Sequence, residues 1–265
     1  MKDKYAFLLS LQSMEREIRR LSGYSELGQE EARYESLQSK LDQLCRFIVS
    51  GENEKLWEEW HSHTEIRLHS NQLRETSVRA LCRIEKYQSK CVCEDKLDIS
   101  DYMTKLSRAV AEELAAFQIN QHSKVLFIGS GAFPLSALTI AKEAGAEVMC
   151  LDSDREAVEM GRKISYHSGL YSRIDFSERL AGESPYLQEA THVIIASLVK
   201  DKLGVLDAIK NKGSNNGKVI IRYGNGLKSL FNYPLPANLT ADWSIIACEQ
   251  KGSIYDTVVL ERKRE

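Results

Sequence analysis

The chain has 265 residues, 43% of them hydrophobic, and its 36 Lys and Arg residues nearly balance its 38 Asp and Glu residues, for a net charge of −2 at pH 7. This balance argues against nucleic acid or an anionic membrane as the main partner, and the length suffices for two modest domains with ordinary cores. No stretch approaches membrane-spanning length, and the N-terminal apolar run is too short and broken for a signal peptide, so we expect a cytoplasmic protein.

The first half of the chain is predicted to be helical. Residues 4–118 contain no proline, and their apolar residues recur at three- and four-residue spacing. Breaks are expected near residues 22–28, at residues 50–51 and within residues 91–100, where Asp98 or Ser100 can cap a further helix. The long helices can pack on each other or on a second copy of the chain, so a homodimer is left open.

From residue 121 onward, short apolar runs alternate with helical patterns, which is typical of a parallel sheet covered by helices. The predicted strands are residues 125–128, 148–151, 173–176, 192–196 and 218–222, followed by an antiparallel pair within residues 243–250 and 255–262. We therefore predict an α/β fold with a Rossmann-like, class I methyltransferase-type sheet at residues 120–265, preceded by an all-α helical bundle domain at residues 1–119.

The turn after the first predicted strand is typical of a nucleotide pocket. Gly129, Ser130 and Gly131 let the backbone turn tightly against a ligand. Asp152 ends the second strand about 20 residues later, where its carboxylate can accept both ribose hydroxyls. Pro134 stands where a dinucleotide site usually has a third glycine, and it suits the first turn of a helix. The pattern favours S-adenosylmethionine, which has no phosphate, over a dinucleotide; a similar turn without a ligand is the alternative.

Ligands of such sheets bind at the carboxyl ends of the strands. Further candidate residues for binding S-adenosylmethionine therefore follow the second, third and fourth predicted strands: Asp154, Leu180, Ala181 and Ser197. Asp154 has an alternative role, because it immediately precedes the helical segment REAVEMGRKISYH and can cap it.

No metal site is predicted. The CVC sequence at residues 91–93 is one residue short of the CxxC spacing of zinc or redox sites, and the six cysteines are expected to be thiols. His61, His63 and His69 lie close together in the sequence. Residues two apart on a helix point to different faces, however, so one ion cannot easily collect them.

Four blocks of the second half together resemble the nicotianamine synthase family: FIGSGAFPLSALTIA, LDSDREAV, THVIIASLV and IIRYGNGLKSLFNYP, in that order. The last block is unusual for methyltransferases, since Arg222 at a strand end is followed by a glycine turn and by Tyr233 before a proline. In the first half, RALCRIEKYQ and DYMTKL are similar to the family segments that carry its active-site glutamate and a tyrosine. These segments contain Glu85 and Tyr102.

Short bacterial members, the histidine 2-aminobutanoyltransferases that start opine-type metallophores such as staphylopine, are the branch that this chain resembles. The resemblance implies transfer of the 2-aminobutanoyl (3-amino-3-carboxypropyl) group of S-adenosylmethionine to the amine of histidine, expected to be D-histidine, with release of 5′-methylthioadenosine. It also implies that Glu85 accepts the proton of the amine and that Tyr102 hydrogen-bonds the amine or a carboxylate. Arg222 and Tyr233 would then hold a substrate carboxylate, and Asn225, which replaces a family histidine, suggests a different acceptor.

Other functions remain open at this point. A nicotianamine synthase proper would condense several S-adenosylmethionine molecules, and a small-molecule methyltransferase would release S-adenosylhomocysteine. An aminopropyltransferase would want more acidic residues than Asp201 after the fourth strand. A protein-binding module on a degenerate nucleotide fold is the non-enzymatic alternative, and the intact glycine turn and Asp152 argue against it.

Overall fold

A computed structural model of the chain describes residues 2–23, 30–99, 103–104, 113–214, 217–237, 239, 242–248 and 253–263. The chain forms two compact units. Unit 1 comprises Met1–Ile84, Tyr223–Leu235 and Glu249–Asp256, and unit 2 comprises Glu85–Arg222, Pro236–Cys248 and Thr257–Glu265. The domain boundary that we predict between residues 119 and 120 remains a prediction.

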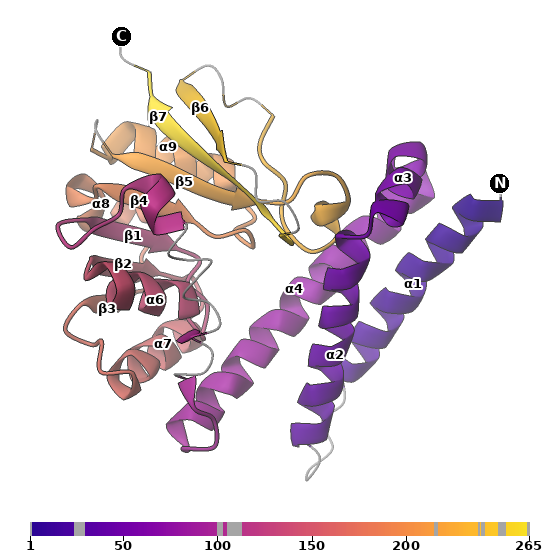
Figure 1. The fold of residues 1–265 in the computed structure, drawn as a ribbon, viewed down its shortest axis with the longest axis horizontal. Coiled ribbons are helices and arrows are strands. Elements are labelled where there is room, and N and C mark those ends of the chain that lie inside the picture. Colours follow the sequence, from indigo (N-terminus) through magenta and orange to yellow (C-terminus); the bar gives the residue numbers. More distant parts are fainter. Residues whose placement is uncertain are drawn as a thin grey trace. The chain divides into compact units, whose positions relative to one another are not determined.

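Unit 1 is built on helices α1 (Lys2–Gly23), α2 (Glu30–Ile48), α3 (Gly51–Trp60) and most of α4 (Thr64–Cys93). Helices α1 and α2 lie side by side (Figure 1). Leucines and other apolar residues at three- and four-residue spacing on these helices are buried in one core, as the periodicity predicts. The expected break at residues 50–51 is present, because α2 ends at Ile48 and α3 begins at Gly51. Most of the other expected break, residues 24–28, lies outside the described residues. A further break at residues 61–63 was not expected.

A later segment of the chain completes unit 1. The short 3₁₀ helix η2 (Gly226–Leu230) packs against α2 and α3. Leu227, Leu230 and Phe231 are buried in the same core cluster as the α1 and α2 leucines. The GNGLKSLFNYP block therefore folds with the helical part of the chain, although it follows a strand of the sheet.

Unit 2 contains a seven-stranded sheet with the order β3-β2-β1-β4-β5-β7-β6 (Figure 1). The strands are β1 (Lys124–Ile128), β2 (Glu147–Leu151), β3 (Ile174–Ser177), β4 (His192–Ile195), β5 (Lys218–Tyr223), β6 (Trp243–Cys248) and β7 (Asp256–Arg262). The pairs among β1 to β5 are parallel, and β6 pairs with β7 in antiparallel register. Each predicted strand is present within two residues of its expected bounds, and the Rossmann-like fold class is confirmed.

The order of the strands reverses between β1 and β4, which are neighbours although β2 and β3 intervene in the sequence. Ligands of open α/β sheets bind at such a reversal, beyond the carboxyl ends of the strands. Helix α6 (Leu135–Ala144) packs on β2 and β3, and α7 (Arg155–His167) packs on β3. Helix α8 (Tyr186–Glu189) packs on β1 and on α9 (Lys202–Lys212). Buried apolar residues on both faces of β1 explain its uninterrupted hydrophobic run.

The helix predicted within DYMTKLSRAVAEELAAF is described only in part. Met103, Thr104 and residues 113–117 are helical. Tyr102 lies outside the described residues, so its role stays a prediction.

Candidate active site

The turn after β1 has the backbone conformation that its glycines suggest. Gly129 and Gly131 have φ angles of 79° and 71°, in the left-handed region that favours glycine. The backbone N–H groups of Gly129 and Ser130 donate to the carbonyl of Leu151 at 2.8 and 3.3 Å. A Cβ atom on Gly129 would lie 2.6 Å from Cγ2 of Val199, so this turn needs glycine to lie against the loop after β4. Pro134 is the N-cap of α6, which begins at Leu135, and its carbonyl accepts a hydrogen bond from the N–H of Leu138 at 3.0 Å.

Asp152, directly after β2, connects the glycine turn after β1 with the turn after β2. Its Oδ2 atom accepts a hydrogen bond from the N–H of Gly131 at 2.8 Å, and its Oδ1 atom accepts one from the N–H of Asp154 at 3.0 Å. The carboxylate is therefore held next to the glycine turn, at the position from which such a residue reaches a ribose.

Asp154 has a structural role in addition to any contact with a ligand. Its side chain caps α7 by accepting a hydrogen bond from the N–H of Glu156 at 3.0 Å. It also forms an ion pair with Lys86 of α4 at 2.7 Å, and the hydrogen bond from Lys86 lowers the pKa of Asp154. The capping role that the sequence leaves open is present.

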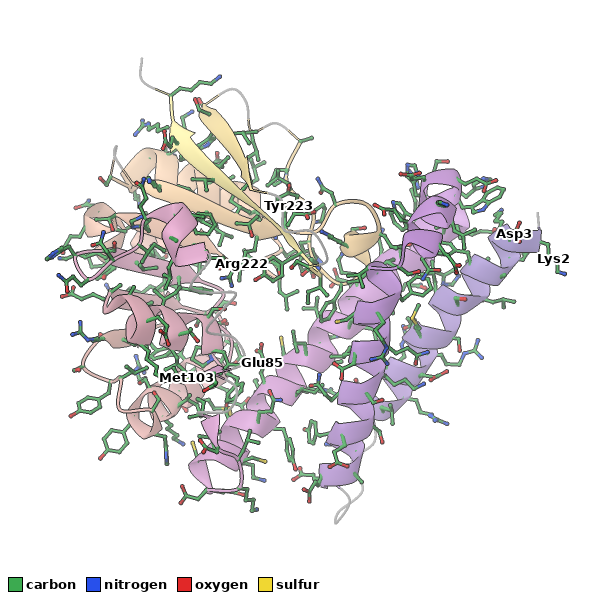
Figure 2. The ribbon with its side chains drawn as sticks, in the orientation of Figure 1. Lys2, Asp3, Glu85, Met103, Arg222 and Tyr223 are labelled. Atoms are coloured by element: carbon green, nitrogen blue, oxygen red, sulfur yellow. The ribbon has the colours of Figure 1, made fainter. Side chains whose placement is uncertain are left out.

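Glu85 is on the last part of α4 (Figure 2). Its carboxyl group lies against the glycine turn. A Cβ atom on Gly131 would collide with the Glu85 carboxyl group, so glycine at this position makes room for it. Burial and the negative charge of Asp152 raise the pKa of Glu85 to about 8, and a hydrogen bond from the backbone of Ala132 acts in the opposite direction. The resemblance singles out this glutamate, and the structure places its carboxyl group next to Asp152 and the glycine turn.

The candidate residues after β3 and β4 differ in their exposure and in their hydrogen bonds. Leu180 is exposed, and Ala181, which begins a short 3₁₀ helix, is buried. The backbone carbonyl of Ser197 accepts a hydrogen bond at 3.0 Å from Nζ of Lys202, which also donates to the carbonyl of Val199 at 2.7 Å. Lys202 is buried, and we did not predict that it stabilises this loop.

Arg222, at the end of β5, is buried (Figure 2). Its Nη2 atom forms an ion pair with the buried carboxylate of Glu113, and its Nη1 atom donates to Oγ of Ser136 at 3.0 Å. The guanidinium also lies over the ring of Phe127, 5.7 Å from its centroid. The sequence alone did not indicate Glu113 or Ser136 as partners.

The remaining candidates lie in unit 1. The hydroxyl of Tyr233 donates to Glu75 at 2.9 Å, and burial together with this bond and the charge of Glu75 raises the pKa of Tyr233 to about 12. The guanidinium of Arg74 lies over the Tyr233 ring, 5.3 Å from its centroid. Asn225 is exposed, and its Oδ1 atom accepts a hydrogen bond from the N–H of Leu235 at 3.1 Å. Neither Glu75 nor Arg74 was predicted.

The three histidines are arranged differently from the helix that we assumed. His61 and His63 lie in the turn between α3 and α4, whereas His69 is on α4 and hydrogen-bonds Gln12 at 2.9 Å. Among the described residues, no group of three or more His, Cys, Asp or Glu side chains could hold a metal ion. None of the described helices is both long enough and apolar enough to cross a membrane.

Residues 70–265 match the family model described as nicotianamine synthase protein. Over 265 residues, the chain is 36% identical to L-histidine 2-aminobutanoyltransferase of Pseudomonas aeruginosa strain UCBPP-PA14, with 99% of each chain covered. It is 32% identical to the protein of the same name from Yersinia pestis over 191 residues, which cover 72% of this chain and 71% of that protein.

Two solved structures share the fold at low sequence identity. A crystal structure of MtNAS in complex with MTA and tNA has a TM-score of 0.76 and 16% identity, with 96% of this chain and 98% of that chain covered. A glutamate-to-glutamine variant of MtNAS in complex with S-adenosylmethionine has a TM-score of 0.74 and 15% identity over the same shares. Both neighbours contain the helical part as well as the sheet, since almost all of each chain is covered.

Proposed function

Because the chain belongs to the nicotianamine synthase family, we propose that it transfers the 2-aminobutanoyl group of S-adenosylmethionine to the α-amine of histidine and releases 5′-methylthioadenosine. The name shared by its full-length relatives supports this activity. The structural observation that carries the proposal is the Glu85 carboxyl group, which lies against the glycine turn and beside Asp152. A proton acceptor at the nucleotide edge suits an amine that must lose a proton before it attacks.

The names of the relatives specify L-histidine. They support L-histidine as the acceptor here, in place of the D-histidine that we expected from the resemblance. The hand of the acceptor depends on where a few polar groups point, so we include both enantiomers in the test.

The residues at the sheet edge fit the proposed co-substrate. Asp152 would bind the ribose hydroxyls, and the turn at residues 129–131 would allow the backbone to approach the ligand, with Leu180, Ala181 and Ser197 as further contacts. The sulfonium of S-adenosylmethionine makes the γ-carbon of its methionine part electrophilic. The protein therefore has to orient an amine toward that carbon and to remove a proton.

Glu85 would accept that proton. In the free protein its pKa of about 8 keeps much of the carboxyl group protonated at neutral pH. A nearby positive charge, such as a sulfonium or an ammonium group, favours the carboxylate and lowers the pKa. Substrate binding would thus convert Glu85 to its basic form. Tyr102 remains a proposed hydrogen-bond donor to the amine or to a carboxylate.

Arg222 remains a proposed ligand of a substrate carboxylate, since its planar fork suits that group. A bound carboxylate would have to share the guanidinium with Glu113 and Ser136. Asn225 and Tyr233 remain proposed acceptor-binding residues. No metal is part of the proposed chemistry.

The product would contain amines, two carboxylates and an imidazole, which are good ligands for transition metals. This composition supports a place early in metallophore biosynthesis, before a reaction that modifies the remaining primary amine.

A product assay tests the proposal. Purified protein is incubated with S-adenosylmethionine and, in separate reactions, L-histidine, D-histidine or no acceptor, and the products are identified by mass spectrometry. We expect methylthioadenosine and a histidine adduct with L-histidine. Nicotianamine without added acceptor would support the synthase proper, and S-adenosylhomocysteine would show a methyltransferase; either result would overturn the proposal.

A further inference from the structure

The last turns of α4 contact the glycine turn through a second residue besides Glu85. Ser89 is fully buried, with 0% of its surface exposed, and its Oγ atom donates to the backbone carbonyl of Ala132 at 2.7 Å. Glu85 and Ser89 are four residues apart, so they lie on the same face of the helix. Both side chains therefore reach the same loop residue.

Ala132 follows Gly131, the glycine against which the Glu85 carboxyl group lies. Its carbonyl accepts the hydrogen bond from Ser89, and its backbone lowers the pKa of Glu85. The preceding N–H, that of Gly131, is used by Asp152 at 2.8 Å. These bonds hold the backbone of residues 131 and 132 next to the Glu85 carboxyl group.

A third contact from the same helix turns is weaker. Lys86 pairs with Asp154 at 2.7 Å and with Glu156 at 2.6 Å, but these carboxylates are 43% and 58% exposed. Exposed ion pairs contribute little because water and salt screen them. The buried Ser89 bond is the stronger restraint on the loop, since breaking it would leave a buried carbonyl without its donor.

We propose that Ser89 is a positioning residue for Glu85: its hydroxyl holds the carbonyl of Ala132 and so keeps the turn at residues 131–132 against the Glu85 carboxyl group. The consequence for turnover rests on the proposed function, whereas the effect on Glu85 itself does not. Without the Ser89 hydroxyl, the buried Ala132 carbonyl loses its donor. The backbone of Ala132 then reorients to find another hydrogen-bond partner. The backbone of the turn, which favours the charged form of Glu85, is then displaced from its carboxyl group.

The test is a titration of the Glu85 side-chain carboxyl carbon by NMR in ¹³C-labelled protein, with the resonance assigned from its absence in Glu85→Gln. We expect Ser89→Ala to raise the pKa of Glu85 by about one relative to the unchanged protein, because the displaced backbone no longer stabilises the carboxylate. Ser165→Ala is the matched control. Ser165 is also buried, and its hydroxyl donates to the Arg162 carbonyl within α7, away from the glycine turn.

Ser89→Cys keeps the side-chain volume with a weaker donor, and it should give a smaller shift in the same direction if Ser89→Ala folds poorly. An unchanged pKa of Glu85 in a folded Ser89 variant would overturn the proposal, and so would an equal shift in Ser165→Ala. The titration needs no turnover, so a protein that fails the product assay but shows the shift would contradict the proposed function alone. With histidine as acceptor, the same variants should need a higher pH to reach half-maximal kcat/KM.

Discussion

Two glutamates of unit 2, Glu85 and Glu113, are placed in opposite electrostatic surroundings. Glu113 is buried against the guanidinium of Arg222, which holds a fixed positive charge. Glu85 has the negative charge of Asp152 nearby, and burial together with this charge raises its pKa to about 8. A carboxylate beside a guanidinium forms an ion pair, whereas a buried carboxyl group beside another carboxylate can exchange a proton near neutral pH. Residue type is the same at both positions, so the difference lies in what the fold places beside each one.

Removing the partner of Glu113 should have the largest effect on stability. Arg222→Met removes the guanidinium that pairs with the buried carboxylate of Glu113, and we expect the free energy of unfolding, measured in urea, to fall by about 3–5 kcal/mol. Arg155→Met is the control, since Arg155 is exposed and pairs with Glu159 on the surface. Adding Glu113→Gln to Arg222→Met should recover part of the loss. If the free energy of unfolding of Arg222→Met falls by less than about 1 kcal/mol, the ion pair stabilises the protein no more than an exposed pair does.

Removing the carboxyl group of Glu85 should affect turnover more than folding. We expect Glu85→Gln to lower kcat by about 10²-fold or more while S-adenosylmethionine still binds, because the variant cannot accept the amine proton. Glu159→Gln, a change at an exposed residue of α7, should leave kcat unchanged. Normal turnover in Glu85→Gln would end the assignment of Glu85 as the base.

The pH dependence of stability and of kcat/KM tests the role of Glu85 further. The pKa of Glu85 is raised from 4.5 to about 8 on folding, so the folded protein prefers the neutral carboxyl group. Its contribution to stability should therefore be lost as pH rises from the unfolded value toward 8, and Glu85→Gln should remove this loss. In the same range kcat/KM should rise with pH and level off above about 8, which a pH–rate profile measures.

The exposed ion pairs of Lys86 should have the smallest effect. Lys86→Met removes its bonds to Asp154 and Glu156, and we expect the free energy of unfolding to change by less than about 1 kcal/mol. Lys86→Arg should restore the pairing. If the free energy of unfolding falls as far as it does in Arg222→Met, the ion pairs between α4 and α7 stabilise the protein as much as the buried pair of Arg222 and Glu113.

Much of the fold could be predicted from local patterns. The uninterrupted apolar runs and the glycine turn identify the strands, and three- and four-residue spacing identifies α1 and α2. The break at residues 61–63 was missed because the WHSH sequence contains neither glycine nor proline. Asp154 was correctly considered as a helix cap, since a cap depends only on neighbouring residues.

The candidate site was less predictable because its contacts join distant parts of the chain. Arg222 and Glu113 are 109 residues apart, and Ser89 and Ala132 are 43 residues apart. Nothing in the local sequence RIEKYQSK separates a glutamate that lies against a glycine turn from one on a solvated helix face. Family resemblance singled out Glu85, and only the three-dimensional arrangement shows which groups surround it.

The most direct test of the proposed reaction is an isotope experiment on its product. S-adenosylmethionine carrying ¹³C at the γ-carbon of its methionine part is reacted with L-histidine carrying ¹⁵N on the α-amine, and the adduct is examined by NMR. We predict a one-bond ¹³C–¹⁵N coupling in the adduct, formed together with methylthioadenosine. A product without this coupling, or one that carries only the methyl group with release of S-adenosylhomocysteine, would contradict the proposed function.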